Sequence, residues 1–204
     1  VTYDGRETAP AAATPTRFLD AEGKLLGRES RVFSGLSVGV PGNIALAAKA
    51  HAAHGTLPWA KLFEPAIALA ENGFVMNPRL HQSLKGNKGR ADKSDYARSV
   101  FFGPDGEPLP IGATVKVPLL AETFRALAKD GPQAMYGSQP AAALAAYVAD
   151  ATPQDGKMTA RDVATYSAKE RAPVCTRYRV YRVCGMGPPS SGGIAVAQML
   201  GQLE

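Results

Sequence analysis

The sequence predicts a helix-rich α+β fold in which a few short strands accompany many helices. Apolar residues recur at helical spacing along several segments, and glycines and prolines mark where those segments begin and end. Strand-like alternation is confined to two short regions. So little sheet cannot cover so many helices, and therefore either the fold is mainly helical or its sheet is completed by residues outside this chain.

The helices are expected in chain order over residues 44–54, 59–63 and 64–73, from Asn77-Pro78 onward, over 118–131 and 139–150, from Thr159 onward, and over 192–204. The boundary signals are Asn43 and Ser138 as N-caps, Gly55, Gly73 and Gly131 as stops, Pro58 and Pro65 in first turns, and a capping box of Thr159 with Asp162. Each signal supplies partners for the helix-end groups that have none within the helix.

The strands are expected in two places. Segments 99–102 and 114–117 flank the turn-rich stretch "GPDGEPLPIGA", and "APVCTRYRVYRVCG" at 172–185 alternates bulky and polar residues on both sides of a short centre. A two-residue turn at Arg179-Val180 would make the second region a hairpin, although Val180 is a poor turn residue. That register places Cys175 opposite Cys184, where a disulfide and two reduced thiols both remain open.

Composition excludes several classes of protein. With 204 residues, 45% hydrophobic and 20% charged, the chain has the make-up of a globular protein with a sizeable core. Its longest apolar runs, such as residues 141–149, are too short to span a bilayer, so no membrane span is expected. The net charge of +5 is spread along the chain, and only segment 85–98 concentrates it, with one aromatic residue. We interpret segment 85–98 as a solvated loop and expect no nucleic-acid binding.

Two short motifs invite a chemical interpretation. "GLSVG" at 35–39 matches a nucleophile elbow, but Pro41 and Gly42 separate it from the next helix and no aspartate lies between Ser37 and the next histidines. "MGPPSSGG" at 186–193 precedes a helix and could hold an anion, but it lacks the lysine and spacing of a phosphate loop. We interpret it as a strand-to-helix elbow. No metal site is expected, because two thiols without a nearby histidine are too few ligands.

Several separated stretches together resemble the gamma-glutamyltransferase family, also called gamma-glutamyltranspeptidase. They are "DGRETAP", "SGLSVGVPGNIALAAKAHAAHGTLPWAKLFEPAIALAENGF", "GPQAMYGSQPAAALAAYVAD", "MTARDVATYSAKERAPV" and "YRVYRVCGMGPPSSGGIAVAQMLGQLE". They follow the family's order and approximate spacing over nearly the whole chain, so the resemblance does not depend on one short motif.

The resemblance implies an N-terminal nucleophile hydrolase with a four-layer αββα core, made as a precursor that cleaves itself into two subunits. Residues 1–204 would be part of the large subunit, without its first portion and without the small catalytic subunit. The family's nucleophile is a threonine at the start of the small subunit, so no catalytic residue is expected in this chain. The missing sheet strands would then lie on the partner subunit.

The resemblance also assigns a role to Arg6, whose position matches the arginine of the family's "RETAP" motif. There it holds the α-carboxylate of the γ-glutamyl donor, and a planar guanidinium suits a two-pronged contact with a carboxylate. We expect Glu7 to orient Arg6 or the adjacent backbone and to take no part in the chemistry. The donor would be glutathione or another γ-glutamyl amide, and water, an amino acid or a peptide would accept the glutamyl group. No cofactor is expected.

Two other interpretations remain open. Relatives of the same architecture include cephalosporin and glutaryl acylases, whose substrates also carry a carboxylate that Arg6 could hold. A chain of this fold could also be a scaffold without catalytic activity. Family habit places such enzymes in the periplasm or outside the cell, and paired cysteines are compatible with that location.

Overall fold

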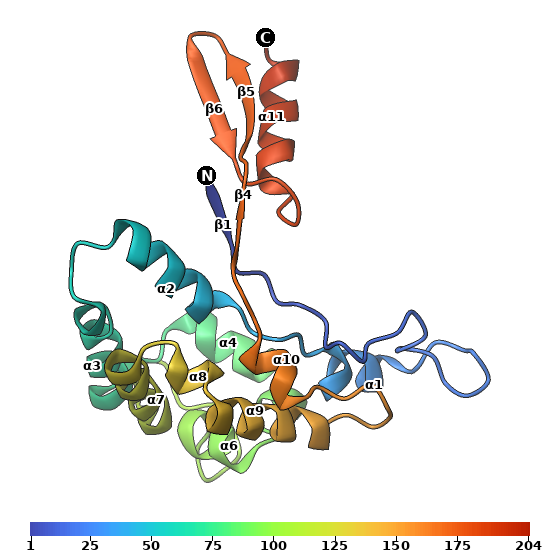
Figure 1. Cartoon of the computed structure of the whole chain (residues 1–204). Coiled ribbons are helices and arrows are strands. Elements are labelled where there is room, and N and C mark those ends of the chain that lie inside the picture. Colours follow the sequence, from blue (N-terminus) through green and yellow to red (C-terminus); the bar gives the residue numbers. More distant parts are fainter. The chain divides into compact units, whose positions relative to one another are not determined.

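The computed structural model describes all 204 residues, which form two compact units. Unit 1 comprises Val1–Gly55 and Met135–Glu204, and unit 2 comprises Thr56–Ala134. Helices hold far more residues than strands, and the strands form three separate antiparallel pairs (Figure 1). The expectation of a helix-rich α+β chain with little sheet of its own is confirmed.

Unit 1 contains the segment before residue 56 and the last third of the chain. Its elements are β1 (Thr2–Asp4), α1 (Arg28–Val32), the short 3₁₀ helix η1 (Gly35–Ser37), α2 (Asn43–His54), α9 (Ser138–Asp150), α10 (Ala160–Ala164), β4 (Lys169–Arg171), β5 (Val174–Tyr178), β6 (Tyr181–Gly185) and α11 (Gly192–Gln202). The helix α8 (Gln133–Tyr136) lies where the two units meet in sequence. Strand β1 pairs with β4, and β5 pairs with β6.

The core of unit 1 forms where α9 packs on α10. Ala141, Ala145 and Val148 recur on one face of α9 and are almost completely buried. Met158 and Val163 close the other side of this cluster. The two alanines let the backbones approach closely, because they add little volume between the helices.

Unit 2 is built from two helical groups and one very short sheet. Its elements are η2 (Trp59–Leu62), α3 (Glu64–Asn72), β2 (Phe74–Val75), α4 (Pro78–Gly86), α5 (Lys88–Ala91), α6 (Asp95–Phe101), β3 (Thr114–Val115) and α7 (Pro118–Asp130). Helix α3 packs against α7, and Trp59 donates from Nε1 to the Leu127 carbonyl at 2.7 Å. The buried cluster comprises Met76, Leu84, Val100, Phe102 and Val115.

Met76 is the largest side chain that is completely buried, at 0% exposure. Met76→Ala should lower the free energy of unfolding by about 2–5 kcal/mol, since the removed atoms leave a cavity that neighbours fill only partly. Val75→Ala is a matched control, because Val75 is 63% exposed and should change that free energy by less than about 0.5 kcal/mol. Chemical denaturation measures both values. Equal losses in the two variants would contradict this assignment of the core.

Most expected helix boundaries are confirmed. Gly73 and Gly131 end α3 and α7 with positive φ angles of 98° and 63°, a conformation that suits glycine. Asn77 accepts the Leu80 amide at the start of α4. At α10, Thr159 and Asp162 form the full capping box, with both reciprocal bonds present.

Two expected N-caps are wrong. Asn43 and Ser138 are the first residues of α2 and α9, and the caps are Gly42 and Gly137, which contribute no side-chain bond. At Gly42 the reason is steric: a Cβ atom there would stand 2.0 Å from the Tyr166 hydroxyl oxygen and 2.3 Å from the Gly5 carbonyl oxygen. Close packing of three segments therefore selects glycine at the cap over a hydrogen-bonding side chain.

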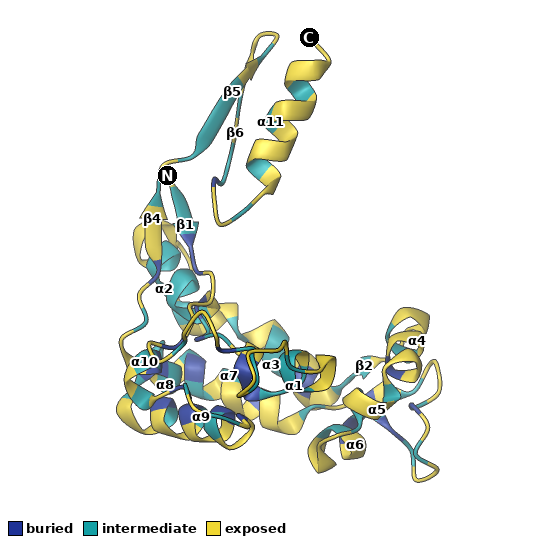
Figure 2. Ribbon diagram, turned by 90° about the vertical axis from the view of Figure 1, so that its right-hand side faces the viewer, coloured by how far each residue is buried: buried dark blue, intermediate teal, exposed yellow.

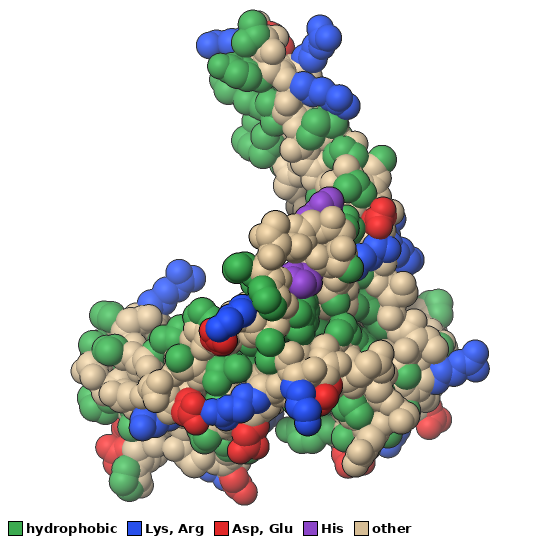
Figure 3. Space-filling view, turned by 60° about the vertical axis from the view of Figure 1, so that its left-hand side comes forward, with side chains coloured by type: hydrophobic (Ala, Val, Ile, Leu, Met, Phe, Trp, Pro, Cys, Tyr) green, Lys and Arg blue, Asp and Glu red, His purple; other side chains and the backbone are tan.

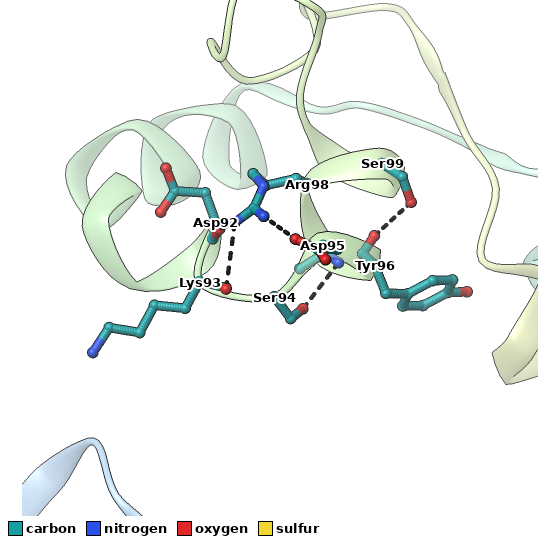
Figure 4. A network of polar contacts seen from close by, with 8 residues as sticks. Asp92, Lys93, Ser94, Asp95, Tyr96, Arg98 and Ser99 are labelled. Carbon is teal, nitrogen blue, oxygen red and sulfur yellow. Dashed lines mark hydrogen bonds and ion pairs between the residues drawn. The ribbon is translucent and has the colours of Figure 1, made fainter. Parts of the chain in front are cut away.

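The interpretation of segments 85–98 and 99–102 is also wrong. Residues 88–91 and 95–101 are helical, and Ser94 caps α6 by accepting the Ala97 amide at 3.0 Å (Figure 4). Arg98 bonds Asp95 three residues earlier, so local polar contacts favour the helix over a strand. Most of segment 85–98 is nevertheless exposed, as expected for a solvated surface. The strand at 114–115 pairs with residues 74–75 instead of 99–102.

The cysteine hairpin is confirmed with the expected register. Cys175 lies opposite Cys184, Tyr178 lies opposite Tyr181, and Arg179 takes a positive φ of 53° in the turn. The two cysteines form a disulfide, which answers the question that the sequence left open. Helix α11 packs against both strands of this hairpin.

Candidate functional site

Arg6 lies two residues after the end of β1, and the pairing of β1 with β4 fixes where it lies. Thr2 pairs with Arg171 and Asp4 with Lys169, so two residues before Arg6 the chain is still held in a sheet. The intervening Gly5 lies against α2, where an added Cβ would approach the Leu46 Cβ to 2.5 Å. Glycine is thus required for the chain to pass this helix and deliver Arg6.

Asp4 anchors the backbone of Arg6. Asp4 is only 6% exposed, and one of its carboxylate oxygens accepts the Arg6 amide N–H at 2.9 Å while the other accepts the Arg171 Nε–H at 2.7 Å. The Arg6 amide, and then the Arg171 guanidinium, lower the pKa of Asp4 below its ordinary value. The carboxylate is therefore ionised at neutral pH, and it links Arg171 of β4 to the backbone of Arg6.

Tyr166 holds the backbone carbonyl group of Arg6. Its hydroxyl donates to the Arg6 carbonyl at 2.7 Å, and its ring stacks on Tyr136 with 6.0 Å between centroids. The Tyr136 hydroxyl donates in turn to the Pro41 carbonyl at 2.9 Å. Burial raises the pKa of Tyr166, which keeps the hydroxyl protonated as a donor. The C=O of Arg6 is thus occupied by a side chain from a distant segment, and its N–H by the side chain of Asp4, two residues earlier.

The guanidinium of Arg6 is left accessible. Nε donates to Glu7 Oε1 at 3.0 Å, and the side chain is 60% exposed. The two terminal nitrogens make no hydrogen bond with another group of the chain. The Glu7 backbone amide, and then the Arg6 side chain, lower the pKa of Glu7, so Glu7 is an anion that orients the guanidinium. The expectation for Glu7 agrees with this geometry.

A cavity of about 160 Å³ opens at this point. It is lined by Asp4, Arg6, Glu7, Thr8, Tyr166, Ser167, Lys169, Arg171 and Pro189. Three cations and two carboxylates face it, and both carboxylates already accept bonds from arginines. A second cavity of about 300 Å³ shares Thr8, Tyr166, Ser167 and Lys169 with the first. The unsatisfied charge in this region is therefore positive, which suits a substrate with a carboxylate.

The ion pair of Asp4 gives an expected acid dependence. Because the folded-state pKa is lowered, the stabilisation by Asp4 is fully present above about pH 4 and is lost as pH falls through the folded-state value. The unfolding midpoint of the natural protein should therefore exceed that of Asp4→Asn at pH 7, and the gap should narrow at pH 3. Urea denaturation at both pH values measures the gap. A gap of equal size would show that Asp4 does not titrate as described.

The other sequence candidates do not form a second site. Ser37 lies in η1 and donates to the Val32 carbonyl, without the strand that a nucleophile elbow needs. The "MGPPSSGG" stretch links β6 to α11, where a Cβ on Gly193 would stand 2.4 Å from the Met186 carbonyl oxygen, as expected for a structural elbow. No three or more His, Cys, Asp or Glu side chains are placed to hold a metal ion. No helix is both long and apolar enough to cross a membrane.

Comparison with known proteins identifies the fold and the family. The crystal structure of gamma-glutamyltranspeptidase from Helicobacter pylori superimposes with a TM-score of 0.84 at 32% identity, over 97% of this chain and 56% of that one. The glutathione hydrolase proenzyme of Escherichia coli K12 is 37% identical over 201 residues, which are 98% of this chain and 34% of that protein. The acylase ACY 1 proenzyme of Pseudomonas sp. SE83 is 35% identical over 209 residues, which are 37% of its length.

The structural similarity establishes the class of protein. The chain has the fold of the corresponding part of an N-terminal nucleophile hydrolase. A gamma-glutamyltranspeptidase family model matches residues 1–204. The chain belongs to the gamma-glutamyltranspeptidase family, and it spans about a third of the length of the curated relatives.

Proposed function

We propose that residues 1–204 are the large-subunit part of an enzyme that cleaves γ-glutamyl amides such as glutathione. The glutamyl group is transferred to water, an amino acid or a peptide. Names of relatives support the substrate class, since several are glutathione hydrolases at 36–38% identity. The name proenzyme supports a precursor that yields two subunits. We treat residues 1–204 as one portion of a single gamma-glutamyltransferase-like domain.

The observation that carries the proposal is the state of Arg6. Its backbone is held at both ends by Asp4 and Tyr166, while its terminal nitrogens stay accessible at a cavity with excess positive charge. A guanidinium held in this way can form two parallel bonds with the α-carboxylate of a γ-glutamyl donor. Fixing that carboxylate orients the γ-carbonyl for attack.

The bond-breaking groups lie on the small subunit in this proposal. A terminal threonine there attacks the γ-carbonyl with its own α-amine as base, and the amine leaving group departs from the resulting γ-glutamyl-enzyme. Water or an amine acceptor then releases the glutamyl group. Arg6 holds the donor through both steps, and residues 1–204 alone should not turn over any donor.

Hydrolysis of two matched amides tests the proposal. The complete protein should process into two chains and cleave a γ-glutamyl anilide faster than a glutaryl anilide, which lacks the α-amino group. The reverse preference would favour the alternative of a cephalosporin or glutaryl acylase, which the 35% identity to acylase ACY 1 supports. Cleavage of neither amide by correctly folded protein would favour a scaffold without catalytic activity.

We also propose a periplasmic or secreted location, which the disulfide between Cys175 and Cys184 supports because such bonds persist in oxidising compartments. Fractionation of the producing cells tests it. Recovery of the native protein with the cytoplasmic markers would contradict it.

A further inference from the structure

The hydroxyl of Tyr136 supplies the cap that α2 lacks. Gly42 precedes α2 and has no side chain that could accept an amide of the first turn. The Tyr136 oxygen accepts the Ala45 N–H at 3.3 Å, and Ala45 is the third helical residue, whose amide an N-cap side chain ordinarily binds. The same hydroxyl donates to the Pro41 carbonyl at 2.9 Å. A side chain 91 residues further along the chain than Ala45 therefore replaces the missing cap.

Tyr136 can hold this turn firmly because it lies in the core of unit 1. It is 8% exposed and belongs to the cluster where Figure 2 shows buried residues on α8, α9 and α10. Burial raises the pKa of Tyr136, so its hydroxyl stays protonated and can donate. Its ring stacks on Tyr166 with 17° between the ring planes. These contacts are internal to unit 1, so they do not require any surface to be open in the complete protein.

The first turn of α2 locates the chain that leads to Arg6. Gly5 is buried against this turn, where an added Cβ would stand 2.5 Å from the Leu46 Cβ and 3.0 Å from the Gly42 carbonyl oxygen. The backbone of Gly5 is thus in direct contact with the turn, and close-packed groups pass displacements to their neighbours. A shift of the first turn therefore moves Gly5 and, with it, the adjacent Arg6.

The hydroxyl of Tyr166 links the same turn to the Arg6 carbonyl. A Cβ on Gly42 would stand 2.0 Å from this oxygen, so the hydroxyl lies where a cap side chain would begin. It donates to the Arg6 carbonyl at 2.7 Å. The two tyrosines together replace the absent cap side chain, since Tyr166 fills its space and Tyr136 makes its hydrogen bond.

We propose that Tyr136 is a positioning residue for the reaction, which acts on Arg6 through the first turn of α2 and through Tyr166. Its hydroxyl touches no substrate in this arrangement. It fixes the turn on which Gly5 and the Tyr166 hydroxyl rest, and thereby the direction in which the Arg6 guanidinium leaves the backbone. The role in donor binding rests on the proposed function, whereas the coupling between Tyr136 and Arg6 is a property of the fold alone.

Tyr136→Phe in the complete two-subunit protein tests the role in donor binding. The variant keeps the stacked ring and removes only the hydroxyl, and the dispersed Lys and Arg side chains of Figure 3 still attract an anionic donor. KM for a γ-glutamyl anilide should rise about 3- to 10-fold and kcat should change less than about 2-fold, since one neutral hydrogen-bonding group away from the reacting atoms is lost. A donor whose α-carboxylate is replaced by a carboxamide should not distinguish Tyr136→Phe from the natural protein.

Val148→Ala is the matched control for a general loss of packing. Val148 belongs to the same buried cluster as Tyr136, at 5% exposure, but it bonds neither tyrosine hydroxyl. The variant should lower the unfolding midpoint in urea and leave KM unchanged. An equal rise of KM in Val148→Ala and Tyr136→Phe, or an equal rise for both donors in Tyr136→Phe, would overturn the positioning role.

Hydrogen exchange tests the coupling without turnover. Peptides that cover residues 3–9 and 43–50 of the complete protein are followed by mass spectrometry. In Tyr136→Phe, exchange should become at least about 3-fold faster in both peptides, because the Ala45 amide loses its acceptor and the Arg6 amide is held less persistently. Val148→Ala should leave peptide 3–9 unchanged.

Faster exchange in peptide 43–50 alone would show that Tyr136 only caps α2, and it would overturn the proposal. If the natural protein cleaves no γ-glutamyl donor, the proposed function fails instead. The exchange rates of peptide 3–9 would still decide whether Tyr136 is coupled to Arg6.

Discussion

Arg6→Lys in the complete two-subunit protein should lower kcat/KM for a γ-glutamyl anilide by about 10- to 100-fold, mainly through a higher KM. Lysine keeps the positive charge but offers one compact ammonium where the guanidinium offers two parallel donors. The expected loss corresponds to one charge-assisted hydrogen bond, about 1.5–3 kcal/mol. Steady-state kinetics with the anilide give the two constants.

A donor without the α-carboxylate provides the control for this prediction. When that carboxylate is replaced by a carboxamide, the natural protein and Arg6→Lys should differ little, because the two-pronged contact is lost in both. Arg79→Lys, an exposed position on α4, should leave both donors unaffected. An unchanged kcat/KM for Arg6→Lys would remove Arg6 from the substrate site.

Asp4→Asn should lower kcat/KM by about 10-fold without removing any group that we place against the substrate. The variant leaves Arg171 without its carboxylate partner and weakens the bond that holds the Arg6 amide. Arg6 then samples orientations that do not suit the donor, so KM should rise more than kcat falls. Asp130→Asn, which is exposed at the end of α7, is the matched control.

A double-mutant cycle separates positioning from a general loss of structure. Arg171→Gln removes the cation that Asp4→Asn leaves unpaired, so the combined variant should lose less than the two single losses added. Additive losses would mean that Asp4 and Arg171 act independently. Normal kinetics for Asp4→Asn would show that the Arg6 backbone is held well enough by Tyr166 alone.

Much of the helical structure could be predicted because its signals are local. Gly73, Gly131 and the pair of Thr159 with Asp162 act within a few residues of the helix ends that they define. The hairpin register followed from the same kind of signal, since a two-residue turn fixes which residues are opposite. The disulfide could be framed as an alternative but not decided.

The predictions from sequence were wrong where the local structure depends on contacts with distant segments or on weak local contacts. Residues 99–102 have strand-like side chains, yet residues up to Phe101 belong to a helix that Ser94 caps, and Phe102 is buried in the core of unit 2. The strand β1 gave no signal, because three residues are too few for an alternating pattern and its partner β4 is far along the sequence. The anchoring roles of Asp4, Tyr166 and Arg171 could not be found for the same reason.

The sequence by itself determined the helix-rich class, most helix ends, the hairpin and, through its resemblance to a family, the choice of Arg6. The tertiary structure alone decided that residues about 160 positions apart hold the Arg6 backbone and that glycine must cap α2. Helix-end and turn signals can be recognised in a sequence because each acts within one or two turns of the chain. The geometry around Arg6 depends on close packing and charge pairing between segments that only folding brings together.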